Sequence, residues 1–172
     1  MKCIVWDIET SNFNADFAIM LSSAFKPIGQ KPYAITKGRK GNNDKELVRA
    51  VRDELEKYDL IIGYYHLGFD LMFLNSRLLY WGLKPLSRKF HIDVYRIARK
   101  VFKIHSRRLI SVAEFLKIPG KTKVNAEDWM EAAYNGNPKA LQHIVEHNIA
   151  DVEVLEAVFD RVKCFILSIS KV

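Results

Sequence analysis

The fold of this chain is decided by its opening segment, Cys3-Ile4-Val5-Trp6-Asp7-Ile8-Glu9-Thr10, in which two carboxylates interrupt an apolar run. The Ile, Val and Trp residues favour a buried β-strand. Because residues i and i+2 of a strand point to the same face, we expect Asp7 and Glu9 to project together. Adjacent carboxylates repel each other and are costly to desolvate, and a divalent metal ion between them is the simplest remedy. The alternative is an exposed strand end at which both acids are solvated.

Length and composition bound the class of protein. The 172 residues suit a single domain, which we expect to span residues 1–172 and to have a core that needs no disulfide. The two cysteines, Cys3 and Cys164, match neither a disulfide framework nor a zinc pattern, so a reducing, cytoplasmic setting is expected. The early acids interrupt any signal-like apolar run. The apolar stretch 164–169 is too short to span a membrane, and we predict that it is the packed end of the last helix.

The net charge of +7 favours a polyanionic partner. Clusters of basic residues can neutralise phosphates and attract nucleic acid to a surface, although many such clusters are ordinary solvated faces. The basic residues gather in two groups: Lys37, Arg39, Lys40 and Lys45 in the first, and Arg96, Arg99, Lys100, Lys103, His105, Arg107 and Arg108 in the second.

Apolar periodicity and turn residues predict strands that alternate with helices. Asp44 is expected to cap the first helix, and Asp93 either to cap the third helix or to support a nearby site. Three strands, an alternating middle and a helical end together predict an α/β sandwich on a mixed sheet of about five strands. The predicted strands are 2–9, 17–25, 32–37, 60–63 and 90–93, and the predicted helices are 44–57, 69–80, 94–103, 109–117, 126–135 and 138–165.

A second acidic element follows the short strand 60–63. Asp70 lies in the first turn of the next helix, where exposed amide groups favour an acid on structural grounds alone. A loop at the end of a central strand is also where α/β sheets build their sites. Gly63 and Gly68 would let a substrate backbone approach, and Phe69 would pack beneath it or wedge against a base.

The third element lies on the long helix over 138–165. His147 and Asp151 are four residues apart and therefore share a helix face. A carboxylate at the core boundary needs a partner, either a metal ion or an arginine. A lone helix histidine such as His147 is more often structural than catalytic. We predict a buried face made of Val145, Ile149, Val152, Leu155 and Val158.

Together, these elements give a constellation that resembles the DnaQ-like (DEDD) 3′–5′ exonucleases of the ribonuclease H-like superfamily. The match consists of Asp7-x-Glu9, then Phe69-Asp70, then Asp151, in the family's order. The chain looks most similar to the group related to the proofreading domains of family B polymerases. The resemblance extends from residue 1 to about residue 160 and implies a ribonuclease H-like three-layer sandwich.

Two positions depart from that family's pattern. Tyr65, with His66 beside it, replaces the asparagine usual in the second motif. His147 occupies the place four residues before the last acid, where this group has tyrosine; the histidine subgroup places its base five residues before, which here is Glu146. Histidine titrates near neutral pH and can therefore still serve as a base.

The resemblance implies that Asp7, Glu9, Asp70 and Asp151 hold two Mg²⁺ or Mn²⁺ ions, and that His147 takes or orients the proton of a water molecule. Oxygen ligands suit these ions, and the lack of a Cys/His cluster argues against zinc. Two of the residues expected to contact nucleic acid, Lys121 and Lys123, could instead be ordinary surface lysines. The expected nucleic-acid contacts are Thr10, His66, Phe69, Lys121 and Lys123.

The sequence thus predicts a metal-dependent 3′–5′ exonuclease acting on DNA or RNA, with a polymerase or repair complex as candidate partner and no membrane association. One alternative is an endonuclease of the same fold, such as a junction resolvase. Another is a catalytically silent nucleic-acid-binding domain. A P-loop NTPase is excluded, because the glycine required five residues before Gly120 is Phe115.

Overall fold

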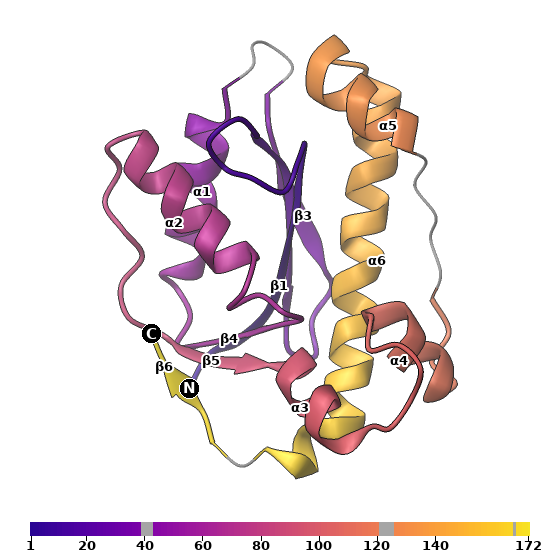
Figure 1. The fold of residues 1–172 in the computed structure, drawn as a ribbon. Helices are drawn as coiled ribbons and strands as arrows, with labels where there is room; N and C mark the ends of the chain where they lie inside the picture. Colours follow the sequence, from indigo (N-terminus) through magenta and orange to yellow (C-terminus); the bar gives the residue numbers. More distant parts are fainter. Residues whose placement is uncertain (39–42, 121–125, 167) are drawn as a thin grey trace.

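The structure, a computed structural model, describes residues 1–38, 43–120, 126–166 and 168–172. The described residues form one mixed six-stranded sheet with the order β3-β2-β1-β4-β5-β6. Helices cover both of its faces (Figure 1). The strands are β1 (Cys3–Thr10), β2 (Met20–Pro27), β3 (Tyr33–Thr36), β4 (Leu60–Gly63), β5 (Phe90–Asp93) and β6 (Ser170–Lys171).

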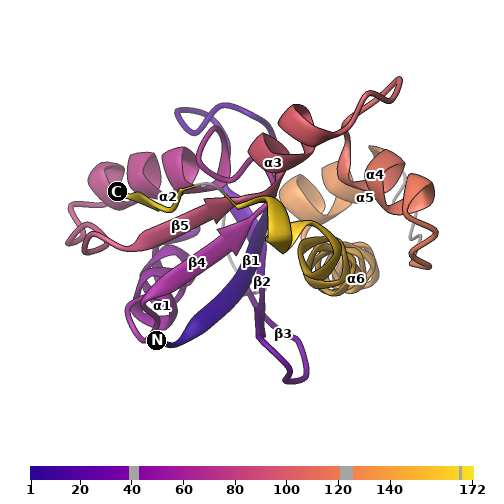
Figure 2. The same cartoon turned by 90° about the horizontal axis from the view of Figure 1, so that it is seen from below.

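The helices divide into two layers, which confirms the predicted three-layer α/β sandwich. Helices α1 and α2 pack on one face of the sheet, and α3, α4 and α6 pack on the other (Figure 2). The helices are α1 (Lys45–Leu55), α2 (Asp70–Tyr80), α3 (Val94–Val101), α4 (Leu109–Phe115), α5 (Ala126–Met130) and α6 (Pro138–Val162), with a π-helical turn at Glu131–Asn135 and a 3₁₀ turn at Lys163–Phe165.

Strand β1 lies in the middle of the sheet, antiparallel to β2 and parallel to β4. Its side chains alternate between the two layers as the pleat requires. Ile4, Trp6 and Ile8 pack with α1 and α2, whereas Val5 packs with α3 and α6. Asp7 and Glu9 share the face of Val5 and therefore point toward α6.

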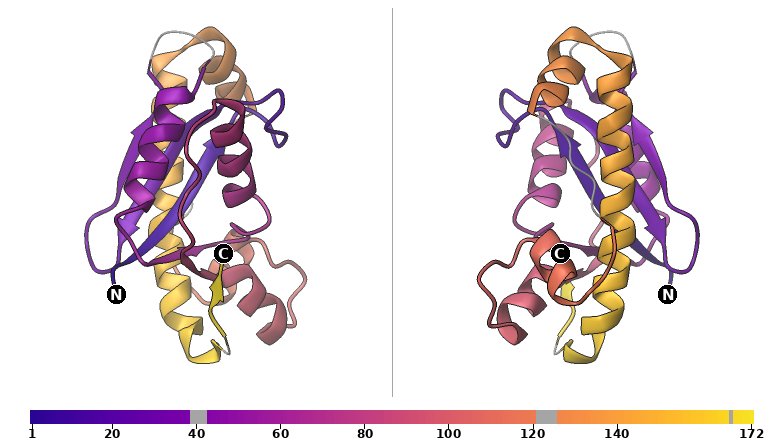
Figure 3. Two further views of the ribbon diagram at one scale, coloured as in Figure 1. Left: turned by 90° about the vertical axis from the view of Figure 1, so that its left-hand side faces the viewer. Right: turned by 90° about the vertical axis from the view of Figure 1, so that its right-hand side faces the viewer.

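Helix α6 runs along the sheet in both side views (Figure 3). Asn137 caps its first turn by accepting hydrogen bonds from the backbone N–H groups of Lys139 and Ala140. The buried face differs from the predicted one near the site, because Val145 and Ile149 are only half-buried. The fully buried positions there are Ile144 and Asn148. The predicted face was assigned from apolar residues, so the polar Asn148 was not recognised as a buried position.

The end of the chain departs from the prediction. The stretch 164–169 is not the packed end of a helix, since α6 ends at Val162 and a 3₁₀ turn follows. Phe165 and Ile169 are 50% and 45% exposed. The chain then pairs antiparallel with β5 as β6. A two-residue strand is too short to show a period of two, so the sequence pattern could not reveal it.

The two expected caps have different outcomes. Asp93 caps α3, since its carboxylate accepts a hydrogen bond from the N–H of Tyr95. Asp44 precedes α1 but makes no capping hydrogen bond. Its buried carboxylate instead pairs with Arg77, at 2.6 Å, and accepts from the indole of Trp81. None of the helices in the described ranges is long and apolar enough to cross a membrane.

Candidate active site

Asp7 is anchored by a residue of α6. Its Oδ2 accepts a hydrogen bond from Nδ2 of Asn148 at 2.7 Å. Burial raises the pKa of Asp7 well above its ordinary value, and the nearby charges of Asp70, Glu9 and Asp151 raise it further. The Asn148 amide opposes this by lowering the pKa of Asp7. Three acids, one on the same strand and two from distant segments, therefore lie within electrostatic reach of Asp7.

Asp70 is held where strand β4 stops. Parallel pairing between β1 and β4 ends at Val5–Ile62, so the N–H of Ile8 lies beyond the reach of β4. Oδ1 of Asp70 accepts that N–H at 3.1 Å. The bond fixes the first residue of α2 against β1. Burial raises the pKa of Asp70 to about 7, against the lowering effect of the Ile8 N–H.

Glu9, His147 and Asp151 form the most compact group of the site. Nε2 of His147 lies 3.6 Å from Oδ2 of Asp151 and 3.9 Å from Oε1 of Glu9. Burial is the largest cause that raises the pKa of Glu9, followed by the charges of Asp151 and Asp70. Burial also raises the pKa of Asp151, while His147 lowers it. The ring of Trp129 on α5 stands edge-on to His147, with ring centroids 6.4 Å apart.

This donor set fits a hard divalent cation. Glu9, His147 and Asp151 each offer a ligand atom, and these atoms lie within 4.8 Å of one another. Asp7 and Asp70 add buried carboxylates whose pKa values are raised. Buried acids that repel one another are stabilised by a bound cation, and carboxylate oxygens suit Mg²⁺ or Mn²⁺.

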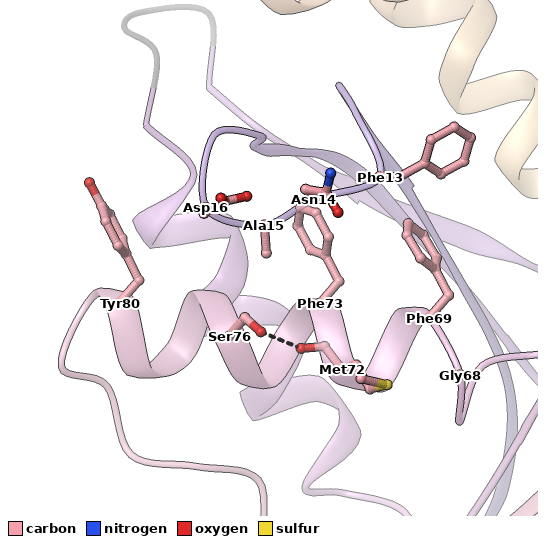
Figure 4. A pocket seen from close by; sticks show the side chains of 10 residues that line it. All are labelled: Phe13, Asn14, Ala15, Asp16, Gly68, Phe69, Met72, Phe73, Ser76 and Tyr80. Carbon is pink, nitrogen blue, oxygen red and sulfur yellow. Dashed lines mark hydrogen bonds between the residues drawn. The ribbon is translucent and has the colours of Figure 1, made fainter.

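An apolar pocket of about 600 Å³ adjoins the start of α2. Phe69 lies on its wall, with ring centroids 6.1 Å from Phe13 and 5.9 Å from Phe73 (Figure 4). Phe13 is 83% exposed although it is aromatic. Thr10 lies at the end of β1, just before the loop that carries Phe13, and its hydroxyl donates to the carbonyl of Asn12. Exposed aromatic rings beside buried acids can receive a flat, apolar group such as a base.

The prediction that His66 contacts nucleic acid is wrong, because its side chain is fully buried. Its Nε2 lies 3.0 Å from Nδ1 of His91, and the two rings stack at 26°. The edge of His66 also meets Trp6 in the core. Histidine is a polar residue, so the sequence favoured an exposed side chain at position 66. The short loop after β4 instead turns this side chain into the core. Lys121 and Lys123 fall outside the described residues.

The structure also identifies a polar residue that sequence reasoning missed. Asn148 is fully buried, and besides its bond to Asp7 it accepts from the hydroxyl of Ser22 at 2.8 Å. Its spacing could have revealed it, because Asn148 lies four residues after Ile144 and four before Val152, both buried. A polar residue at a core position of a helix requires a buried partner.

The two basic groups differ in the structure. Lys37 is buried rather than part of an exposed cluster, and burial lowers its pKa. Arg39 and Lys40 lie outside the described ranges. The second group is more open, since Arg96, Arg99 and Lys100 are exposed on α3.

Comparison with known proteins identifies the family of this chain. The model of the family described as the RNase_H superfamily matches residues 4–163. The chain belongs to the RNase_H superfamily. The structure of this chain also resembles part of the family B DNA polymerase of Pyrobaculum calidifontis. The match covers 95% of this chain and 24% of that one, with a TM-score of 0.80 and 18% identity. The predicted resemblance to the ribonuclease H-like superfamily is confirmed.

Two curated DNA polymerases contain sequences similar to this RNase_H chain. The PolC-type DNA polymerase III of Ureaplasma parvum is 28% identical over 135 residues, which cover 64% of this chain and 9% of that protein. A DNA polymerase of Archaeoglobus fulgidus is 26% identical over 144 residues, covering 67% of this chain and 17% of that protein. This chain therefore spans less than a fifth of the length of either relative.

Proposed function

We propose that this chain is a metal-dependent 3′–5′ exonuclease that hydrolyses phosphodiester bonds of DNA or RNA with two Mg²⁺ or Mn²⁺ ions. The observation that supports it most is the convergence of four acids from distant segments. Asp7 and Glu9 come from β1, Asp70 from α2 and Asp151 from α6, and burial raises the pKa of each. A fold has no structural need to gather acids that repel one another.

Asp7, Glu9, Asp70 and Asp151 would hold the metal ions. Bound there, the cations would make a water molecule more acidic and offset the charge of the phosphate. Asn148 and the N–H of Ile8 orient Asp7 and Asp70 through the hydrogen bonds described above. Each of these bonds is donated to a carboxylate oxygen, which fixes the direction in which the acid points.

His147 would receive the proton of the attacking water at Nε2. That atom lies 3.9 Å from Oε1 of Glu9 and 3.6 Å from Oδ2 of Asp151. His147 lies on α6 one turn before Asp151, so the helix itself places it beside that acid. In this proposal, His147 acts on the attacking water from the position at which the resembled group has tyrosine.

Phe69 and Phe13 would hold the terminal base, and Thr10 would contact the terminal nucleotide. The apolar pocket beside these rings can hold a base because every base has an apolar face. The DNA polymerases among the relatives support a polymerase or repair complex as the partner of this chain.

The decisive experiment is incubation with 5′-labelled single-stranded DNA and RNA in Mg²⁺ or Mn²⁺. The expected product is a ladder that shortens from the 3′ end and is lost in EDTA and in Asp7→Ala. Asp53→Ala, which removes an exposed acid of α1, should cleave like the parent protein. Internal cuts would instead indicate an endonuclease. Binding without any cleavage would indicate a silent binding domain.

A further inference from the structure

A second pocket, of about 860 Å³, lies next to the candidate active site. Its size falls within the range of ligand-binding sites, which extends from roughly 300 to 1,000 Å³. The pocket is formed by the loop after β4, by α3 and by the chain that follows α6. Its lining includes an aromatic and basic group of residues: Tyr65, Tyr95, Arg96, Arg99, Lys100 and Phe165.

Tyr65 has an unusual conformation in this wall. Its φ angle is +60°, in the left-handed region that costs a non-glycine residue roughly 1–2 kcal/mol. The backbone is held there because the N–H of Tyr65 donates to Oδ1 of Asp93 at 2.9 Å. The Tyr65 side chain nevertheless remains 52% exposed. The strained backbone thus places an aromatic ring at the surface.

The ring of Tyr65 bridges two elements of the site. It stands edge-on to Tyr95 of α3, with centroids 5.1 Å apart. On its other side it covers Gly68, where an added Cβ would lie 2.7 Å from the ring. Gly68 precedes Asp70 by two residues and also lines the apolar pocket of Phe69. The two pockets therefore meet at Gly68, beside the acids.

The far wall of this pocket is basic. Arg96, Arg99 and Lys100 are exposed on α3, and the acid nearest to Arg96 is Asp93 at 3.9 Å. Within the described ranges, neither Arg99 nor Lys100 forms an ion pair. Their charges are therefore available to an anionic ligand. A row of cations beside exposed aromatic rings is the combination that binds single-stranded nucleic acid, through phosphate contacts and base stacking.

We propose that this pocket, which we term the Tyr65–α3 groove, holds the nucleotides on the 5′ side of the one being removed. The proposal rests on the exonuclease function for the direction of the strand. In it, an unpaired base stacks on Tyr65, and the following phosphates contact Arg96, Arg99 and Lys100. The substrate is single-stranded, because bases inside a duplex are stacked on both faces by their neighbours and leave no face free for the ring.

The first test measures binding without catalysis. Fluorescence anisotropy in EDTA would follow 5′-labelled DNA and RNA oligonucleotides of increasing length, from about 3 to 12 nucleotides. The parent protein should bind longer strands more tightly. The charge reversal R99E/K100E should weaken binding of the longest strand at least about tenfold. It should also reduce the salt dependence of the affinity by the amount expected for the loss of about two phosphate contacts. The matched reversal R49E/K57E, on α1 and in the turn just after it, makes the same change in net charge elsewhere and should have a much smaller effect.

A second pair of variants tests the ring itself. Tyr65→Asn tolerates the positive φ angle but removes the stacking surface, so the longest strand should bind about fivefold more weakly or worse. Tyr65→Phe keeps the ring and should bind like the parent protein. Thermal unfolding of both variants would show that the fold is kept.

Several results would overturn the proposal that the Tyr65–α3 groove binds nucleotides. They are an affinity that does not grow with strand length, equal losses in R99E/K100E and R49E/K57E, and parent-like binding by Tyr65→Asn. Because no metal ion is present, these results do not depend on hydrolysis. A protein that binds strands through the groove but cleaves none would refute the exonuclease proposal alone.

Discussion

The side-chain amide of Asn148 donates a hydrogen bond to Oδ2 of Asp7 over 2.7 Å, while its carbonyl accepts from Ser22 at 2.8 Å. One buried amide thus joins α6 to both β1 and β2. It also supplies a donor to the acid that has the most acidic neighbours, and it lowers the pKa of Asp7 against the effect of burial. A hydrogen bond within the candidate site therefore fixes the position of α6 relative to β1.

We first predict that Asn148→Ala lowers the free energy of unfolding by about 1–3 kcal/mol, because it leaves the hydroxyl of Ser22 and a carboxylate oxygen without this partner. Urea unfolding at neutral pH would measure the loss. Gln142→Ala, on the exposed side of the same helix, is the control and should change stability by less than about 0.5 kcal/mol. Equal losses in both variants would refute the role given to Asn148.

The second prediction concerns the metal-free acids. Because the folded-state pKa values of Asp7, Glu9, Asp70 and Asp151 are raised, the folded protein retains protons that the unfolded chain releases. The stability from these groups is complete below their ordinary values. It is lost as the pH rises through the folded values, of which that of Asp70 is about 7.

Adding Mn²⁺ should therefore raise the unfolding temperature more at pH 8 than at pH 5. Asp7→Asn should stabilise the metal-free protein at pH 8, by about 1 kcal/mol or more, and should reduce the effect of Mn²⁺. Thermal shift with and without EDTA would measure both. Asp53→Asn on α1 should behave like the parent protein, and a Mn²⁺ effect of equal size in Asp7→Asn would argue against these ligands.

The third prediction separates the base from the metal ligands. His147→Ala should lower the cleavage rate by about 10²-fold or more, as expected for the loss of a general base. The thermal shift caused by Mn²⁺ should be largely kept, since the carboxylates remain. His143→Ala, one turn earlier and more exposed, should cleave normally. An unchanged rate and pH profile in His147→Ala would assign the proton transfer to another group.

The fourth prediction concerns the buried histidine pair. Burial lowers the pKa of His66 to about 3 and that of His91 to about 4. The unfolded chain therefore binds protons that the folded protein excludes, so this stability is complete above about pH 6.5 and is lost as the pH falls. Between pH 7 and pH 5, the parent protein should lose about 1–2 kcal/mol more than His91→Gln does. Urea unfolding at several pH values would measure this difference, and His143→Gln should follow the parent protein.

The fifth prediction compares two glycines. An added Cβ at Gly63 would lie 2.4 Å from the ring of His66, which is fully buried and has no room to move. Gly63→Ala should therefore cost about 1–3 kcal/mol. At Gly68 the added Cβ would meet the half-exposed ring of Tyr65, which can swing into solvent, so Gly68→Ala should cost less. Urea midpoints would rank the two variants, and the reverse order would be incompatible with these contacts.

Much of the fold could be predicted because single residues carried clear signals. The spacing of Asp7 and Glu9 correctly placed both on one face of β1. The spacing of His147 and Asp151 correctly placed both on one side of a helix, and the structure brings them to within 3.6 Å of each other. These signals are local, and they depend only on the periods of strands and helices.

The remaining features depend on contacts between distant segments. Asp44 looked like a helix cap, yet Arg77, 33 residues away, takes its carboxylate. His66 looked available to a ligand, yet His91, 25 residues away, stacks on it in the core. The partners of Asn148 lie 126 and 141 residues away. The sequence names such residues but does not state which distant residue each one will meet.

Asp93 shows how closely the loop of the second motif depends on its neighbour. One oxygen of its carboxylate accepts the N–H of Tyr65 and also the N–H of Tyr95 that opens α3. The loop and the first turn of α3 thus share one acceptor, and a movement of Asp93 would weaken both hydrogen bonds at once. The two segments should therefore open to solvent as one cooperative unit, with linked amide exchange.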